Sequence, residues 1–143
     1  MKMEKLEYLF QEYEKSFDKL NIEAIAKYYD DTFISAGPKG TIARNKNEFM
    51  SKARQASEMY RSIGQNSAKI LSKGITQISN EYALVTVHWG VTFEKTGDKI
   101  TEFDVSYLVR QTGDDTKIVL FISHEDEEEA MKKLGLRPQF STS

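Results

Sequence analysis

The chain has 143 residues, a formal net charge of −2 and no cysteine. This length predicts a single domain that buries roughly 70% of the surface its unfolded chain exposes. The dispersed lysines and arginines argue against nucleic-acid binding, and the absence of cysteine excludes disulfides and thiolate metal sites. No apolar run approaches the ~18 residues of a membrane-spanning helix, so we expect a soluble, cytoplasmic protein.

The N-terminal part of the chain has the pattern of two amphipathic helices. Leu6, Phe10, Tyr13 and Phe17 recur at steps of three and four, which predicts a helix from about residue 3 to 19 with an aromatic-rich face. Asn21 is a suitable N-cap for a second, shorter helix that stops at 30–31. We expect both helices to bury one face.

A short hairpin and a third helix follow. Residues 32–36 and 41–44 are strand-like and flank a turn at 37–40. Asn45 with Glu48 three residues later has the capping-box pattern, and Gly64 suits a helix C-terminus. We therefore expect a helix between these positions that lies on the sheet. Its apolar stripe consists of Phe49, Ala53, Ala56, Tyr60 and Ile63.

Three strong strand patterns occupy residues 80–124. From Tyr82 to Phe93, and again from residue 100 to 111, apolar side chains alternate with polar ones. The run at 117–124 is apolar in both phases, which predicts a central strand covered on both faces. Residues 65–79 are only weakly strand-like and suit a sheet edge, with Gly74 as a candidate bulge or kink.

The register between the two alternating strands decides which side chains face the core. Pairing odd with odd positions sets Trp89 opposite Tyr107 and leaves His88 and Asp104 together on the other face. A slip of one residue would instead bring Trp89 beside Ser106. We favour the first register because it segregates the apolar residues.

The C-terminal residues predict one more short element. Acids at 125–129 followed by lysines at 132–133 favour a short terminal helix, with Gly135 as its stop. We expect a single domain over residues 1–136 and a flexible tail at 137–143. The fold class is then α+β, with helices first and most strands later.

This order of elements resembles the nuclear transport factor 2-like superfamily, in its SnoaL-like, ketosteroid isomerase-like and uncharacterised bacterial members. The resemblance covers nearly the whole chain and includes residues 28–34, Tyr-Tyr-Asp-Asp-Thr-Phe-Ile, which join the second helix to the first strand. It implies a cone, in which a strongly bent mixed or antiparallel sheet wraps three helices and leaves a pocket at the wide end. It also implies a homodimer through the outer sheet face.

Residue by residue, the similarity to ketosteroid isomerases is partial. The hydrogen-bonding tyrosine of their first helix matches Tyr13, and their second oxyanion donor aligns closest to Tyr107, with Asp104 three residues away. The position of their general base falls on Ala36. A tyrosine can donate to an oxyanion, but without the base the sequence does not support steroid isomerase chemistry.

Aromatic residues are concentrated at positions that we expect to face the inside of the cone. Rings with hydroxyl or indole tips suit a mainly apolar organic ligand held by a few polar anchors. The alternative is that these rings form only the core. The candidate ligand-binding residues are Tyr13, Phe17, Tyr29, Phe33, Trp89, Tyr107 and Phe121.

Four residues are candidates for acid–base chemistry. His88 with Asp104 or Glu102 is the constellation that the strands can assemble, although the favoured register puts it on the outer face, where dimer contacts are the alternative. Asp31 either supplies a base at the pocket rim or only closes a helix. His124 lies either at the pocket mouth or beside the terminal helix as its cap. No metal-binding spacing or phosphate-binding glycine loop is present, so we expect no metal and no cofactor.

Three functions stay open. The first is a homodimer that binds a small, mainly apolar organic ligand, with no reaction assigned. The second is an isomerase, dehydratase or cyclase type of enzyme that transfers protons with one of the four acid–base candidates. The third is a non-catalytic dimeric assembly module whose exposed sheet face, with Leu84, Leu120 and Ile122, carries the function.

Overall fold

The computed structural model describes residues 1–113, 115–126, 129 and 132. Its elements are, in chain order, α1 (Met3–Asp18), α2 (Ile22–Ala26), β1 (Tyr29–Gly37), β2 (Gly40–Asn45), α3 (Lys46–Ile63), β3 (Gln65–Gln77), β4 (Tyr82–Phe93), the short 3-10 helix η1 (Glu94–Thr96), β5 (Ile100–Thr112) and β6 (Asp115–Ser123). The helix expected at 125–133 falls mainly outside the described residues, and the tail at 137–143 falls entirely outside them.

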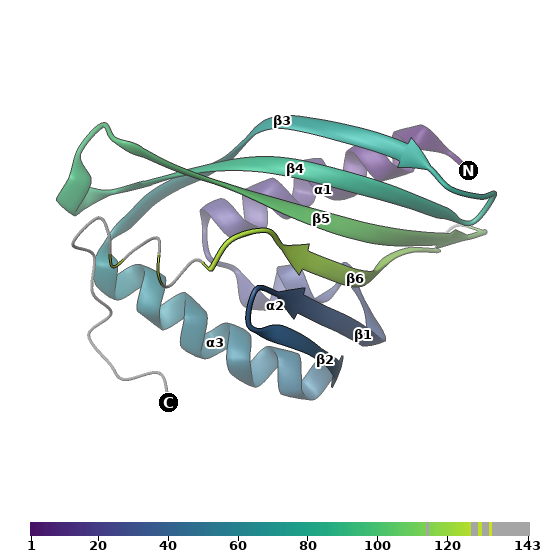
Figure 1. Ribbon diagram of the computed structural model, residues 1–143, viewed down its shortest axis with the longest axis horizontal. Coiled ribbons are helices and arrows are strands. Elements are labelled where there is room, and N and C mark those ends of the chain that lie inside the picture. Colours follow the sequence, from purple (N-terminus) through teal and green to yellow (C-terminus); the bar gives the residue numbers. More distant parts are fainter. Residues whose placement is uncertain (114, 127–128, 130–131, 133–143) are drawn as a thin grey trace.

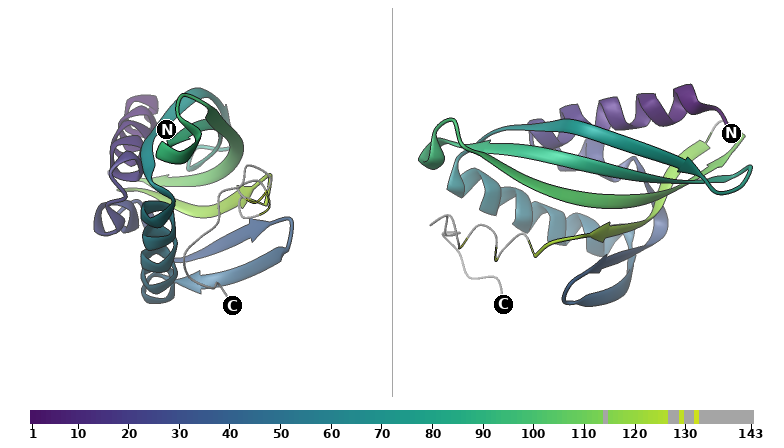
Figure 2. Two further views of the ribbon diagram at one scale, coloured as in Figure 1. Left: turned by 90° about the vertical axis from the view of Figure 1, so that its left-hand side faces the viewer. Right: turned by 45° about the horizontal axis from the view of Figure 1, so that its top comes forward.

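The six strands form one mixed sheet in the order β2-β1-β6-β5-β4-β3 (Figure 1). Strands β1 and β6 run parallel, and the other neighbours are antiparallel. The sheet is strongly curved, and the helices lie on one side of it, which we call the inner face (Figure 2). The predicted α+β class and the bent mixed sheet are confirmed.

Asn21 and Asn45 begin α2 and α3, and Gly64 ends α3, as predicted. The predicted end of α2 at 30–31 was wrong: the helix ends at Ala26, because the chain is already extended as β1 from Tyr29 onward. The Asn21 side chain accepts a hydrogen bond from the Ala24 amide at 3.3 Å, and Asn45 accepts one from the Glu48 amide at 2.9 Å. Gly64 ends α3 with a φ of 83°, a left-handed conformation that glycine adopts at little cost. Within the described part of the chain, no helix has the length and apolarity to cross a membrane.

Strands β4 and β5 confirm the predicted assignment of faces. His88 lies opposite Asp104, and odd positions pair with odd positions, so Trp89 and Tyr107 share the inner face. The predicted partner of Trp89 was wrong by four residues, because Trp89 lies opposite Phe103 rather than Tyr107. The cause is η1, because this helix places the middle of the turn before residues 97–98, where the glycine and aspartate predicted it. An even shift preserves the faces.

Strand β6 is central, as predicted, but it is not covered on both faces. Ile122 is 39% exposed on the outer face. Odd and even positions of β6 are both apolar, and a shift of its register against β5 after Ile118 accounts for this pattern. Because of the shift, Ile118 and Phe121 both face inward, while Leu120 faces outward. A bulge of this kind changes which side of the sheet the later residues occupy.

Strand β3 lies at the sheet edge, as predicted. The predicted bulge or kink at Gly74 was wrong, because the register of β3 shifts at other residues. The register shifts occur between Gln65 and Ser67 and between Ile70 and Ser72, whereas Gly74 pairs regularly with Thr86. The glycine under tight packing is Gly90 of β4. A Cβ there would lie 2.8 Å from the Leu71 side chain and 2.9 Å from that of Ile100.

Candidate functional site

A chamber of about 300 Å³ lies between the inner face of the sheet and the three helices. Its walls are mainly apolar, and α1, β1, β4, β5 and β6 each contribute aromatic rings. Six of the seven predicted ligand-binding residues line it: Tyr13, Phe17, Tyr29, Trp89, Tyr107 and Phe121. Apolar walls that carry a few polar groups are a common feature of small-molecule pockets.

The polar tips of the chamber form hydrogen bonds with one another. The Trp89 indole N–H donates to the Tyr107 hydroxyl at 3.2 Å, and the hydroxyls of Tyr13 and Tyr29 lie 2.8 Å apart. The Tyr13 ring also contacts Trp89 and Tyr107, with ring centroids 5.9 Å and 5.6 Å apart. Because all four side chains are buried, these hydrogen bonds hold the rings of the wall in fixed orientations.

Phe33 is the one predicted ligand-binding residue that does not line the chamber. It is 1% exposed and lies within 5.0 Å of Phe49 and 6.3 Å of Phe121, measured between ring centroids. Phe33 therefore supports the wall from behind, which is the core role that the sequence left open.

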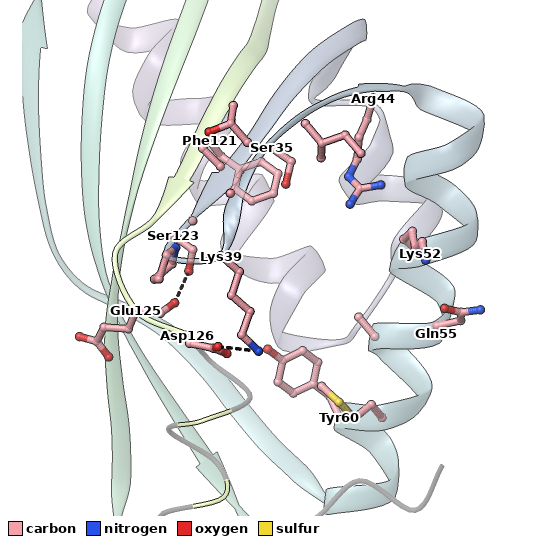
Figure 3. A pocket seen from close by; sticks show the side chains of 18 of the residues that line it. Ser35, Lys39, Arg44, Lys52, Gln55, Tyr60, Phe121, Ser123, Glu125 and Asp126 are labelled. Carbon is pink, nitrogen blue, oxygen red and sulfur yellow. Dashed lines mark hydrogen bonds and ion pairs between the residues drawn. The ribbon is translucent and has the colours of Figure 1, made fainter. Parts of the chain in front are cut away.

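The chamber adjoins a larger outer pocket of about 1110 Å³, which we call the vestibule (Figure 3). The vestibule lies between α3, the β1–β2 hairpin and the end of β6. Lys39 and Asp126 form an ion pair of 2.9 Å across it. The residues that line both spaces form a junction: Ser35, Arg44, Lys52, Ala56, Tyr60, Phe121 and Ser123.

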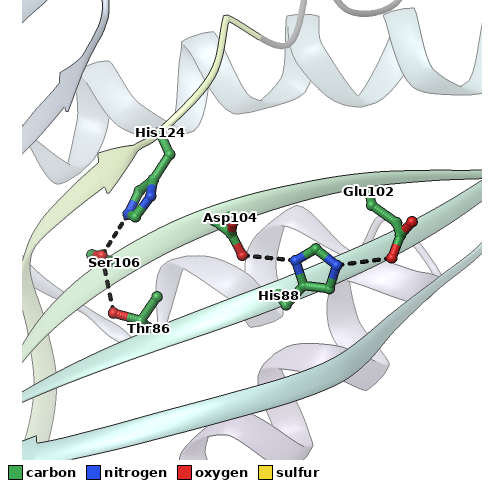
Figure 4. A network of polar contacts seen from close by, with 6 residues as sticks. All are labelled: Thr86, His88, Glu102, Asp104, Ser106 and His124. Atoms are coloured by element: carbon green, nitrogen blue, oxygen red, sulfur yellow. Dashed lines mark hydrogen bonds and ion pairs between the residues drawn. The ribbon is translucent and has the colours of Figure 1, made fainter.

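His88 and its acidic partners lie on the outer face of the sheet, as the favoured register predicted (Figure 4). One ring nitrogen, Nδ1, lies 2.7 Å from the Asp104 carboxylate, and the other, Nε2, lies 2.9 Å from Glu102. The hydrogen bond to Glu102, followed by that to Asp104, raises the pKa of the His88 imidazole above its ordinary value. The imidazole is thus held between two carboxylates, on the side away from the chamber.

The other two acid–base candidates also lie outside the chamber. The Asp31 side chain is 94% exposed and lies 3.7 Å from the Lys46 ammonium. His124 forms a 2.7 Å hydrogen bond with Ser106, whose hydroxyl also contacts Thr86 on the outer face (Figure 4).

The position of these residues bears on the enzyme hypothesis. None of the four candidates lines the chamber, and no carboxylate or imidazole does so among the residues that the structure describes. Proton transfer to a ligand in the chamber through His88, Asp104, Asp31 or His124 therefore has no geometric basis. The described residues also contain no cluster of three histidine or acidic side chains that could hold a metal ion.

Sequence reasoning missed the contribution of β2 and α3 to the site. Arg44 of β2 and Lys52, Ala53 and Ala56 of α3 line the chamber. A signal was available in the small alanines at 53 and 56, which interrupt the larger side chains of the α3 stripe and leave space beside the sheet. Nothing local pointed to Arg44 and Lys52, because they line the same space only in the folded chain.

Comparison with protein families matches residues 4–126 to the family described as NTF2-like protein (DUF6841). A comparison with curated proteins finds no match.

Solved structures with the same fold are distant in sequence. An NTF-2 like protein of unknown function from Shewanella oneidensis is 19% identical, with a TM-score of 0.70 over 87% of this chain and 100% of that one. A cystatin-like protein of unknown function from Nostoc punctiforme is 16% identical, with a TM-score of 0.65 over 85% and 89% of the two chains. An NTF2-like protein of unknown function from Pseudomonas putida is 10% identical, with a TM-score of 0.69 over 96% and 93%. At these identities the likeness shows the fold alone.

Proposed function

Since the chain belongs to the NTF2-like protein family DUF6841 and one fold can host many functions, we propose a function from the site of this chain itself. We propose that the protein binds a small, mainly apolar organic molecule in the chamber. The observation that carries this proposal is the chamber of about 300 Å³ whose aromatic walls are held by internal hydrogen bonds. A pocket with pre-positioned walls loses little conformational freedom when a ligand enters, which favours binding.

The experiment uses Trp89, the single tryptophan of the chain, as its reporter. Its indole lines the chamber, so a ligand that enters changes its emission. We expect saturable changes with uncharged cyclic and linear compounds that do not absorb in the ultraviolet range of tryptophan. Ala53→Phe fills part of the chamber and should weaken this binding about tenfold or more. Ser51→Phe, at an exposed position of the same helix, is the matched control and should leave binding unchanged.

A different result would contradict the proposal. If no compound gives a saturable response, and Ala53→Phe raises the melting temperature, the chamber is a packing void that a larger side chain fills favourably. If the chamber is a ligand site, compounds should bind to the wild-type protein and bind more weakly to Ala53→Phe.

We also propose that the outer sheet face pairs with a second copy of the chain. Apolar side chains from four neighbouring strands form a continuous row there: Ile34, Leu120, Leu108 and Leu84 pair in succession across β1, β6, β5 and β4. Ile34 is 39% exposed at one end of the row. A contiguous apolar patch of this kind is typical of an interface.

Sedimentation velocity over a range of concentrations tests this pairing. Leu108→Lys, in the middle of the row, should convert a dimer into a monomer, while Ile78→Lys, at a 61% exposed apolar position outside the row, should not. A wild-type chain that stays monomeric at all concentrations would refute the pairing without affecting the chamber proposal.

A further inference from the structure

Two cationic side chains stand at the junction between the chamber and the vestibule. Arg44 of β2 and Lys52 of α3 line both spaces. Figure 3 shows the Arg44 guanidinium directed into the pocket, between its own strand and α3. Neither side chain forms an ion pair or a hydrogen bond with any residue that the structure describes.

Cations nearby on the same elements are paired. Lys39, in the turn before β2, lies 2.9 Å from Asp126, and Lys46, in the first turn of α3, lies 3.7 Å from Asp31. Arg44 and Lys52 therefore differ from these two lysines, because they line the pocket without a carboxylate partner among the described residues.

Among the described residues, the carboxylates that line these two spaces all lie in the vestibule. Glu58, Glu125 and Asp126 line it, and none of them lines the chamber. On the chamber side of the junction the walls are apolar or carry hydroxyl groups. An anionic group at the junction would meet two cationic side chains, and no carboxylate of the described chamber wall would oppose it.

We infer that the ligand of this site is an amphiphilic carboxylate, whose apolar chain or ring enters the chamber while its carboxylate meets Arg44 and Lys52. This inference rests on the proposed binding function and specifies the ligand class. A guanidinium can donate two parallel hydrogen bonds to one carboxylate, and a lysine ammonium adds a third donor.

The size of the chamber limits the apolar part. If each non-hydrogen atom takes roughly the 30 Å³ of a water molecule in the liquid, the space of about 300 Å³ holds about ten such atoms. Medium-chain and single-ring carboxylic acids meet this limit.

The test compares octanoate with octanamide, which has the same length and shape but no charge. Trp89 emission and isothermal titration calorimetry measure both affinities. We expect octanoate to bind about tenfold more tightly than octanamide, the usual difference for a hydrogen-bonded charge at a partly exposed site. The double variant Arg44→Gln/Lys52→Gln should remove this difference by weakening octanoate alone. Arg54→Gln, on α3 but outside both pockets and paired with Glu23, is the matched control.

The outcomes separate the two proposals. Octanamide that binds as tightly as octanoate, or a double variant that leaves octanoate binding unchanged, would overturn the carboxylate inference and leave an apolar ligand site. Displacement of octanoate by inorganic phosphate at equal concentration would also overturn it, because the cations would then bind an anion without help from the chamber. Failure of every compound, charged or neutral, would refute the binding function itself. Circular dichroism of the variants checks that they are folded.

Discussion

The hydrogen bond between Trp89 and Tyr107 allows a quantitative test of the chamber wall. Tyr107→Phe removes the hydroxyl that accepts the indole N–H at 3.2 Å. Trp89 is 0% exposed and Tyr107 is 3% exposed, so the indole N–H loses its acceptor in a buried place. Leaving a buried donor unsatisfied costs about 1–3 kcal/mol. For a chain of this size we expect the melting temperature to fall by roughly 3–9 °C.

Urea unfolding followed by Trp89 emission and by far-ultraviolet circular dichroism measures this loss. The control is Tyr8→Phe at a 62% exposed position, where we expect a change within about 0.5 kcal/mol. A double-mutant cycle with Trp89→Phe, followed by circular dichroism, isolates the energy of the pair from the other contacts of each ring.

A loss below about 0.5 kcal/mol for Tyr107→Phe would refute this reasoning. The indole N–H would then have another partner, and water inside the chamber is the natural one, because it can replace a lost protein acceptor. The chamber would in that case be a wetter site than the proposed apolar ligand requires.

Three further predictions test the fold around the site. Gly90→Ala should lower the free energy of unfolding by about 1 kcal/mol, because the added Cβ overlaps the Leu71 and Ile100 side chains, which are partly exposed and can move. Gly74→Ala, with open space around it, should be neutral or stabilising, and equal effects of the two substitutions in urea unfolding would contradict the packing described. The folded-state pKa of His88 is raised, so its ion pairs stabilise the protein fully below pH ~6.5 and this contribution disappears as the pH rises through the folded-state pKa. Nuclear magnetic resonance titration should show a pKa above ~6.5 that falls in Asp104→Asn; an unchanged pKa would count against the contact. Asn45→Ala should cost about 1 kcal/mol in thermal unfolding, because α3 loses its cap, and an unaltered melting temperature would argue against that role.

The walls of the chamber that come from β4 and β5 could be predicted because side-chain direction in a strand has a period of two. Parity places Trp89 and Tyr107 on one face and His88 and Asp104 on the other for every turn that keeps odd positions opposite odd positions. Gly97, with a φ of 61°, marks the turn, but nothing local indicates that the three residues before it form the helix η1.

The junction could not be predicted in the same way. An apolar stripe shows which face of α3 is buried, but it does not fix where the helix lies along the sheet. Arg44 and Lys52 line the same space as Phe121 only after the hairpin, α3 and the end of β6 have packed together. Their approach depends on contacts between distant parts of the chain, and these leave no local pattern.

The parallel pairing of β1 with β6 constrains how the protein is made on the ribosome. Ile34 of β1 pairs with Leu120 of β6, so the N-terminal hairpin leaves the ribosome long before β6 has been synthesised. Until that strand arrives, β1 and β5 both present open edges that other nascent chains can join, and cotranslational chaperones have their greatest use in this interval.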